Sequence, residues 1–330
     1  MQIKKLVHGG IMVNYKCNAA CRHCLYACAP TRTGGYMTAE TAQKVCDLLV
    51  QGGCYSVHIG GGEPFLDFGG LMTLVKTLRR AGISIEYIET NGFWSADKNE
   101  AVKKLKELIA AGGNALCISV DPFHAEFVPP ERPVALAELC RSTGMDYFLW
   151  QQRFLPMLSR LDMSKAHSRS KLENAISPYY ILETANSYGL RFGGRAINIE
   201  EEYASAMPLS QLLDSSPCAG LASGSHFHID VYGRLIPPGC AGITIPLEDA
   251  VNGIADGAYP VMEALYKNGT AGLFEYASNL GFVPDEKGYT SKCVLCFYIR
   301  KWLCENAPSP ELYAEHYEHS VIYSYRQNAK

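Results

Sequence analysis

Short apolar runs alternate with longer amphipathic segments through the first two hundred residues of the chain. Runs typical of buried strands lie at 10–15, 56–60, 83–90, 115–120, 146–153 and 190–199. Helical periodicity fills the intervals at about 38–52, 70–81, 96–111, 133–144 and 178–188. Strands that alternate with helices form right-handed parallel units. Six such units predict an α/β fold, either an open doubly wound sheet or a partial (βα)6 TIM-like barrel.

The pattern changes after residue 200. A hairpin is predicted over 227–236, and helices are predicted at about 260–268, at 270–280 and from 293 onward. A last helix is predicted over 309–325, because Ser309 and Pro310 are typical of a helix start. We therefore expect a partial barrel at 1–200, a smaller α+β domain at 201–306 and a helical tail at 307–330.

Charge and hydropathy exclude several classes of protein. The chain has 330 residues with 30 Lys and Arg against 33 Asp and Glu, so it presents no broad cationic surface and we expect no nucleic-acid partner. No apolar run approaches the roughly 18 residues of a membrane span, and the first ten residues lack the apolar core of a signal peptide. We expect a cytoplasmic protein, with no membrane partner and with reduced thiols.

Thirteen cysteines then require metal binding, catalysis or burial as an explanation. Cys17, Cys21 and Cys24 form a C-x3-C-x2-C loop directly after the first predicted strand. Three thiolates in one short loop can hold three corners of a cubane iron–sulfur cluster and leave one iron open. The alternatives are a zinc site that lacks a ligand, or structural thiols.

The next strand ends deliver further polar groups to the same edge of the sheet. In both sheet architectures the chemistry belongs at the carboxyl ends of the strands. The second strand is followed by Gly61-Gly62-Glu63-Pro64, the third ends at Thr90-Asn91, and the fourth ends at Ser119 with Asp121 beyond it.

The C-x3-C-x2-C loop followed by Gly-Gly-Glu-Pro resembles the radical S-adenosylmethionine (radical SAM) enzymes, over about residues 10–200. The resemblance implies that the three cysteines bind a [4Fe-4S] cluster whose fourth iron chelates S-adenosylmethionine. It implies that the Gly-Gly-Glu segment meets the methionine amino group and that four strand-end residues line the ribose and methionine site. Those four residues are Thr90, Asn91, Ser119 and Asp121.

Three further residues extend the predicted site, and one of them departs from the family's usual motif. His23 occupies a position that is usually aromatic in the family, and its ring can stack on adenine. The resemblance makes Arg195, in Gly194-Arg195-Ala196, a candidate partner for the cofactor carboxylate or for the substrate. Arg153, at the end of the fifth predicted strand, is a second candidate, and a plain surface role is open for both arginines.

The last third resembles the SPASM and twitch extensions of the same family, which carry auxiliary iron–sulfur clusters. Cys218, a glycine-turned hairpin, Cys240 and then Cys293-x2-Cys296 reproduce their order. Four thiolates suffice for one auxiliary [4Fe-4S] cluster, with Cys304 as a possible substitute ligand. A structural zinc site with the same four thiolates is the alternative.

Other cysteines and histidines have simpler interpretations. Cys46, Cys54 and Cys140 are predicted core residues, and Cys28 a buried thiol. Cys117 is predicted to be a core residue as well, with a position facing the barrel interior as the alternative. His226 and His228 lie on one hairpin face, either exposed to solvent or forming a substrate wall, and His124 is the best histidine for substrate or proton chemistry.

The resemblance implies an enzyme that reductively cleaves S-adenosylmethionine to a 5′-deoxyadenosyl radical, abstracts hydrogen from its substrate and uses the auxiliary cluster for oxidation or cross-linking. The implied substrate is a peptide or a small polar molecule, and the implied reductant a flavodoxin or ferredoxin. The first strand begins near residue 10, so we expect no N-terminal peptide-recognition domain. Two alternatives stay open: a small-molecule dehydrogenase or rearranging enzyme of the same family, and a non-catalytic iron–sulfur electron carrier.

Overall fold

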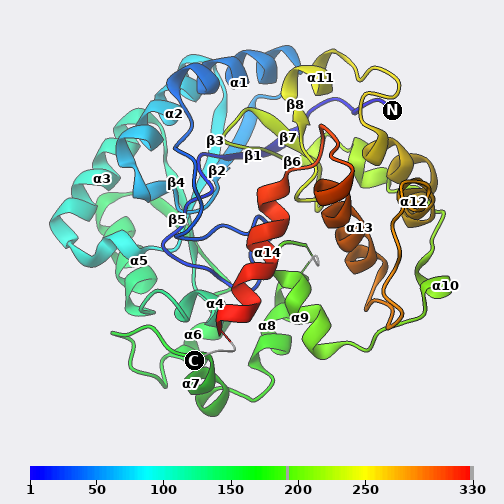
Figure 1. The fold of residues 1–330 in the computed structure, drawn as a ribbon. Helices are drawn as coiled ribbons and strands as arrows, with labels where there is room; N and C mark the ends of the chain where they lie inside the picture. The colour runs from blue at the N-terminus through cyan, green and yellow to red at the C-terminus, as the bar shows by residue number, and fades with distance from the viewer. Residues whose placement is uncertain (191–192, 328–330) are drawn as a thin grey trace.

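A single eight-stranded sheet runs through the computed structural model, which describes residues 1–190 and 193–327 (Figure 1). The strand order is β5-β4-β3-β2-β1-β6-β7-β8. The strands are β1 (His8–Met12), β2 (Ser56–Gly60), β3 (Ser84–Thr90), β4 (Ala115–Ser119), β5 (Asp146–Trp150), β6 (Ser225–Ile229), β7 (Arg234–Ile236) and β8 (Ile245–Pro246). The six strands from β5 to β6 are parallel, and β7 and β8 are antiparallel additions.

Helices follow the first five strands along the outside of the sheet. The long ones there are α1 (Ala39–Gln51), α2 (Phe68–Arg80), α3 (Lys98–Ala111) and α5 (Glu131–Thr143), and Figure 1 shows them side by side. The short elements between them are η1 (Pro64–Leu66), η2 (Phe93–Ala96), α4 (Pro122–Ala125), η3 (Gln152–Phe154), α6 (Leu155–Leu158), α7 (Arg169–Ala175) and α8 (Tyr180–Tyr188).

Local sequence signals explain these boundaries. Thr38 caps α1 because its side chain accepts a hydrogen bond from the backbone N–H of Thr41. Gly112 and Gly144 end α3 and α5 in the left-handed conformation that glycine adopts without steric cost. The predicted α/β fold with a parallel sheet is therefore confirmed, with the five predicted strands and their helices in place.

The predicted sixth strand at 190–199 is wrong. Part of it lies outside the described residues, and α9 (Ala196–Tyr203) occupies the rest, with Ile197 and Ile199 buried. The sixth parallel strand is β6, which pairs with the free edge of β1 instead of extending the sheet beyond β5. Parallel pairing joins segments that are distant in sequence, so an apolar run alone does not specify which edge it occupies.

The C-terminal third continues the same sheet and adds a layer of helices. These elements are α10 (Leu209–Leu212), η4 (Ala219–Ala222), α11 (Leu247–Asn252), α12 (Pro260–Asn279), α13 (Lys292–Asn306) and α14 (Ala314–Gln327). The predicted hairpin is present as β6 and β7, and α12 is kinked at Asn268 and Gly269, where two helices were predicted. The division at residue 200 stays a prediction, although the sheet crosses it.

The tail helix begins five residues later than predicted, at Ala314. Its expected first turn contains Glu311, whose carboxylate is fully buried and accepts hydrogen bonds from the backbone N–H groups of Val261 and Met262. The acidic residue therefore caps the N-terminus of α12, a distant helix, rather than its own.

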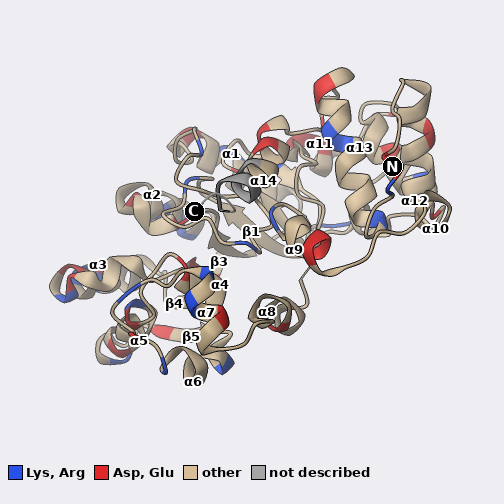
Figure 2. Ribbon diagram, turned by 60° about the horizontal axis from the view of Figure 1, so that its bottom comes forward, with Lys and Arg blue, Asp and Glu red and all other residues tan. Residues whose placement is uncertain are grey.

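Both signs of charge are interspersed on the outer helices, as on α3 and α5 in Figure 2. None of the helices in residues 1–190 and 193–327 has the length and hydrophobicity that crossing a membrane requires.

Candidate functional site

A cavity of about 840 Å³ opens over the inner face of the sheet, at the carboxyl ends of β1 to β4. Its lining includes the C-x3-C-x2-C loop, the Gly-Gly-Glu segment and the ends of β3 and β4. At the other side it reaches Gly220, Pro238 and Gly239, which adjoin Cys218 and Cys240 in sequence. The cavity therefore extends from the first cysteine group toward the second.

The three cysteines of the loop all line this cavity. Cys17 and Cys21 are buried and Cys24 is partly exposed. A hydrogen bond with Cys28 lowers the pKa of the Cys24 thiol to about 5. Burial, in contrast, raises the pKa of the Cys17 thiol, and the charges of Cys21 and Glu63 raise it further, which disfavours the Cys17 thiolate. A bound cation such as an iron cluster reverses this balance.

Among the residues that the structure describes, no three His, Cys, Asp or Glu side chains surround a position for a single metal ion. A cubane cluster differs from a single ion because each thiolate binds a different iron.

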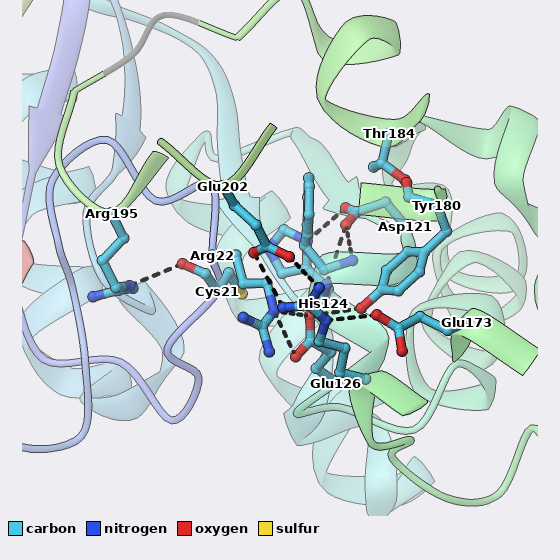
Figure 3. A network of polar contacts seen from close by, with 12 residues as sticks. Cys21, Arg22, Asp121, His124, Glu126, Glu173, Tyr180, Thr184, Arg195 and Glu202 are labelled. Carbon is cyan, nitrogen blue, oxygen red and sulfur yellow. Dashed lines mark hydrogen bonds and ion pairs between the residues drawn. The ribbon is translucent and has the colours of Figure 1, made fainter. Parts of the chain in front are cut away.

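Arg195 is buried beside the loop and holds its backbone. Its guanidinium donates to the carbonyl oxygens of Cys21 (2.9 Å) and Cys28 (2.6 Å), and Figure 3 shows it pointing toward Cys21. Gly194 allows this approach, because an added Cβ would lie 2.2 Å from the Leu25 carbonyl oxygen. The sequence predicted a partner for the cofactor carboxylate or for the substrate, or else a plain surface role. Arg195 is buried and lines the cavity, and these two contacts also make it a clamp on the cysteine loop.

Gly61 and Gly62 pack directly against the chain that enters the loop. An added Cβ on Gly62 would lie 2.0 Å from the carbonyl oxygen of Lys16, and one on Gly61 would lie 2.7 Å from that of Asn14. Gly61 also has a φ of +133°, which side chains rarely adopt. Both glycines are thus required by the fold itself. Pro64 follows in η1 and accepts a hydrogen bond from Tyr36 Oη through its carbonyl oxygen.

Glu63 ties this segment to the end of β3. Its carboxylate accepts hydrogen bonds from Thr90 Oγ1 (2.9 Å) and from the backbone N–H groups of Asn91 (2.8 Å) and Phe65 (3.1 Å). Burial raises its pKa to about 7. The Thr90 hydroxyl, which donates to Glu63, also accepts a hydrogen bond from Trp94 Nε1. The Asn91 amide donates to Asn18 within the cysteine loop (2.9 Å). The Glu63 carboxylate is therefore already hydrogen-bonded to groups of the protein itself.

Asp121 orients His124, which lines the cavity. The Asp121 carboxylate accepts from His124 Nδ1 (2.6 Å), from the Tyr188 hydroxyl (2.6 Å) and from two backbone N–H groups of α4. Burial opposes ionisation of Asp121, but His124 outweighs it and holds the pKa of Asp121 well below its usual range. Ser119, in contrast, lines the cavity, and its hydroxyl makes no hydrogen bond with another residue in the described part of the chain.

His23 also lines the cavity, between two aromatic rings. It stacks on Phe123 with ring centroids 4.8 Å apart and contacts Tyr188 at 4.8 Å. Burial lowers its pKa to about 3, so the ring is neutral and has an apolar, aromatic character. This is the property that stacking on adenine requires.

Arg153 is not brought into the site. It lies exposed in η3 and does not line the cavity. The basic group on the outer side of the loop is Arg22 instead, which binds the carboxylate of Glu126 at 2.9 and 3.1 Å. Tyr180 donates to the same carboxylate, as Figure 3 shows, and so anchors the loop to α8.

The second cysteine group also comes together. Burial raises the pKa of Cys240 to about 12; Arg300 opposes this effect, and the charges of Cys296, Cys218 and Cys293 add to it, so the four thiols lie within range of one another's charge. Burial likewise raises the pKa of Cys304, but its charged neighbours are Arg300, Glu305 and Glu318 rather than cysteines.

The remaining thiols lie where they were predicted. Cys46, Cys54 and Cys140 are fully buried, as is Cys28, and Cys117 lines the cavity from β4. Sequence reasoning missed Tyr26, Tyr87, Glu89, Trp150 and Tyr188, which also line it. The i, i+2 spacing of Tyr87 and Glu89 in β3 is the signal that identifies one face of a strand.

The loop geometry fits an iron–sulfur cluster with an open position: three cavity-lining thiols, a clamped backbone and a glycine segment alongside. Residues 11–148 match the model of the Radical SAM superfamily. This segment, which contains the cysteine loop, the Gly-Gly-Glu segment and strands β2 to β4, is therefore similar to the radical SAM superfamily.

The individual proteins and structures that resemble this chain share little sequence identity with it. YydG of Bacillus subtilis (strain 168), whose name assigns it to peptide biosynthesis, is 26% identical over 166 residues, 50% of this chain and 48% of that protein. This chain thus matches about half the length of its relative. The crystal structure of Streptococcus suis SuiB bound to S-adenosylmethionine is 14% identical, covers 94% of this chain and 77% of that one, and gives a TM-score of 0.45. Native anSMEcpe with bound AdoMet is 15% identical over 98% of both chains, with a TM-score of 0.45.

Proposed function

We propose that this protein is a radical SAM enzyme that modifies a peptide. The observation that carries the proposal is the set of three thiols of Cys17, Cys21 and Cys24 lining one cavity with the Gly-Gly-Glu segment and the ends of β3 and β4. When bound there, a [4Fe-4S] cluster and S-adenosylmethionine supply a 5′-deoxyadenosyl radical, which abstracts hydrogen from the substrate.

In this proposal the residues of this chain bind the cluster, hold the cysteine loop in position and contact S-adenosylmethionine. Three cysteine thiolates hold the cluster, and Arg195 keeps their loop in position through two carbonyl oxygens. The neutral ring of His23 offers a stacking face for adenine. Among the strand-end groups, we assign the Ser119 hydroxyl to the ribose and methionine, because the Asn91 amide already donates to Asn18 and its oxygen accepts from the backbone N–H of Phe93. The backbone of Gly61-Gly62 is assigned to the amino group.

We propose that Cys218, Cys240, Cys293 and Cys296 hold one auxiliary [4Fe-4S] cluster. The mutual influence of these thiols on the pKa of Cys240 supports this ligand set. An auxiliary cluster near the cavity can accept an electron from a substrate radical, which suits a net oxidation or a cross-link. A tetrathiolate zinc site with the same ligands is the competing proposal.

The peptide substrate is supported by the name of YydG, which covers half of the chain. The cavity of about 840 Å³ is large enough for one or two amino-acid side chains beside a cofactor. A small polar molecule is the alternative substrate, and a flavodoxin or ferredoxin the proposed reductant.

The first test is S-adenosylmethionine cleavage by anaerobically reconstituted protein with dithionite. We expect 5′-deoxyadenosine from the wild type and none from a variant with Cys17→Ala, Cys21→Ala and Cys24→Ala. Absence of 5′-deoxyadenosine from a wild type that holds about eight irons per chain, as two cubanes would, contradicts the enzyme and favours an electron carrier.

The second test measures how much metal each of the two cysteine groups holds. The triple variant should retain roughly half the iron, because the auxiliary site is intact. Cys240→Ala should lose the other half, whereas the matched Cys304→Ala should lose none. Zinc in place of that half identifies the structural alternative, and loss of all iron from the triple variant contradicts two separate sites.

A further inference from the structure

The inner face of the sheet carries a pair of histidines that the proposed chemistry does not use. His58 in β2 and His228 in β6 both lie opposite Gly10 of the intervening β1. Their Nε2 atoms are 3.1 Å apart, and a Cβ on Gly10 would lie 2.3 Å from the Nε2 of His58. The glycine therefore makes room for two imidazoles that meet across the middle strand.

Both imidazoles are uncharged. Burial lowers the pKa of His58 to about 4, and His226 and His8 lower it further. Burial also lowers the pKa of His228 well below its usual range, and His58 and His226 lower it further. One ring therefore donates to the other, and the pair adds polarity to the cavity without adding positive charge.

Glu89 lies beside this pair, on the same inner face. Its side chain lines the cavity and makes no hydrogen bond or ion pair with any residue in the described part of the chain. Gly60 leaves the space for it, because a Cβ there would lie 2.5 Å from Glu89 Oε2. Burial raises its pKa to about 7, and Glu63 adds to this effect.

Two basic groups that line the cavity, Arg195 and His124, have partners other than Glu89. Arg195 donates to the carbonyl oxygens of Cys21 and Cys28, and His124 is bonded to Asp121. His124 lowers the pKa of Glu89 through space but makes no ion pair with it. A carboxylate facing a cavity without a cation is a costly arrangement unless a ligand supplies the cation.

Aromatic rings surround the same space. Tyr87 stacks on His58 with centroids 5.0 Å apart, Phe148 meets Tyr87 edge-on at 5.4 Å, and Tyr26 lies 5.2 Å from His228. All of these rings line the cavity. The faces of such rings attract ammonium and guanidinium groups, whose charge a nearby carboxylate then neutralises.

We propose that Glu89 and these rings bind a cationic group of the substrate, an ammonium or guanidinium, such as a lysine or arginine side chain of the peptide. This inference deepens the proposed function and rests on it for the peptide nature of the substrate. The neutral His58–His228 pair contributes an acceptor for an N–H of the same group without repelling its charge.

The test measures binding of two small probes to the cluster-loaded protein by calorimetry at pH 8, without S-adenosylmethionine or dithionite. N-acetyl-lysine methylamide carries the cation, and N-acetyl-norleucine methylamide has nearly the same shape without it. The wild type should prefer the lysine probe by about tenfold or more, the typical strength of one charged hydrogen bond. Equal affinities overturn the proposal.

Glu89→Gln should abolish the preference while keeping the affinity for the norleucine probe. Glu86→Gln is the matched control, because Glu86 is exposed on the same strand, accepts from Ser56 Oγ and does not line the cavity. It should behave as the wild type. A preference that survives Glu89→Gln overturns the proposal.

If Glu89→Gln binds neither probe, Glu89→Asp decides, because it keeps the carboxylate. It should retain a preference for the lysine probe, and its failure to do so contradicts the proposal. Because no cofactor turnover takes part, a failed preference leaves the 5′-deoxyadenosine result unaffected, and absent 5′-deoxyadenosine leaves the binding result unaffected.

Discussion

Replacing Arg195 by methionine should loosen the cysteine loop. The guanidinium donates to two buried carbonyl oxygens, those of Cys21 and Cys28, at 2.9 and 2.6 Å. Methionine fills much of the same volume but donates no hydrogen bond, so both acceptors lose their partner in the closed loop.

The expected cost follows from these two contacts. A hydrogen bond from a charged donor is worth about 1.5–3 kcal/mol, and the lower value is appropriate because the carbonyls regain water when the loop opens. Two bonds then give about 3 kcal/mol, which raises the population of the open loop roughly 100-fold.

The assay is the rate at which a ferrous-iron chelator removes iron from the reconstituted protein under anaerobic conditions. Arg195→Met should release the iron of the first site roughly 100-fold faster than the wild type if opening precedes release. In cluster-free protein, Cys28, which is buried, should also react faster with iodoacetamide. Arg195→Lys, which keeps one donor, should fall between the two.

Arg153→Met is the control, since Arg153 is exposed and does not line the cavity. It should leave both rates unchanged. Equal effects of the two substitutions, or an unchanged rate in Arg195→Met, would refute the reasoning that Arg195 acts by clamping the loop.

Three further changes test the inner face of the sheet and the helical layer. Gly10→Ala should destabilise the protein by about 1–3 kcal/mol, because the methyl group would overlap the His58–His228 pair; urea unfolding measures this, and Gly35→Ala, where a Cβ meets nothing within 4 Å, should be nearly neutral. Gly269→Ala should also destabilise, since φ is +55° and a Cβ would lie 2.4 Å from the carbonyl oxygens of Asp214 and Ser216; a loss no greater than in Gly35→Ala contradicts the steric account of the α12 kink. Glu89→Gln should stabilise the cluster-free protein by roughly 3 kcal/mol at pH 8, because a carboxyl whose pKa in the folded state is raised from 4.5 to about 7 destabilises the fold above pH 7 and ceases to do so as the pH falls toward 4.5. Unfolding at several pH values checks the sign, and a stabilisation that persists undiminished at pH 4.5 would show another cause.

Local patterns predicted the elements of the parallel sheet because each is specified within its own segment. Thr38 caps α1 as expected, and the break in α12 falls at Gly269, as the sequence indicated. The sixth strand was not predictable in the same way. Two apolar runs, 190–199 and 225–229, could form this strand, and which of them does so depends on pairing with the distant edge of β1.

The site shows the same division between local and distant information. The spacing of Cys17, Cys21 and Cys24 identified the loop, because the three thiols and the chemistry lie within one short segment. The contacts of Glu63 with Thr90 and Asn91, and those of Arg195 with the cysteine loop, were not predictable, because these partners lie 27 or more residues away in the chain. A motif thus specifies which residues surround a cofactor, but not which of them touch it.

The most direct test of the central claim is whether the cluster held by Cys17, Cys21 and Cys24 has an open iron that binds S-adenosylmethionine. Electron paramagnetic resonance of the dithionite-reduced protein measures this, recorded before and after addition of S-adenosylmethionine. We predict that the spectrum of one cluster changes in the wild type and in Cys240→Ala, and that the triple cysteine variant lacks this cluster and its response. A wild-type spectrum that S-adenosylmethionine leaves unchanged, with both clusters present, would contradict the account.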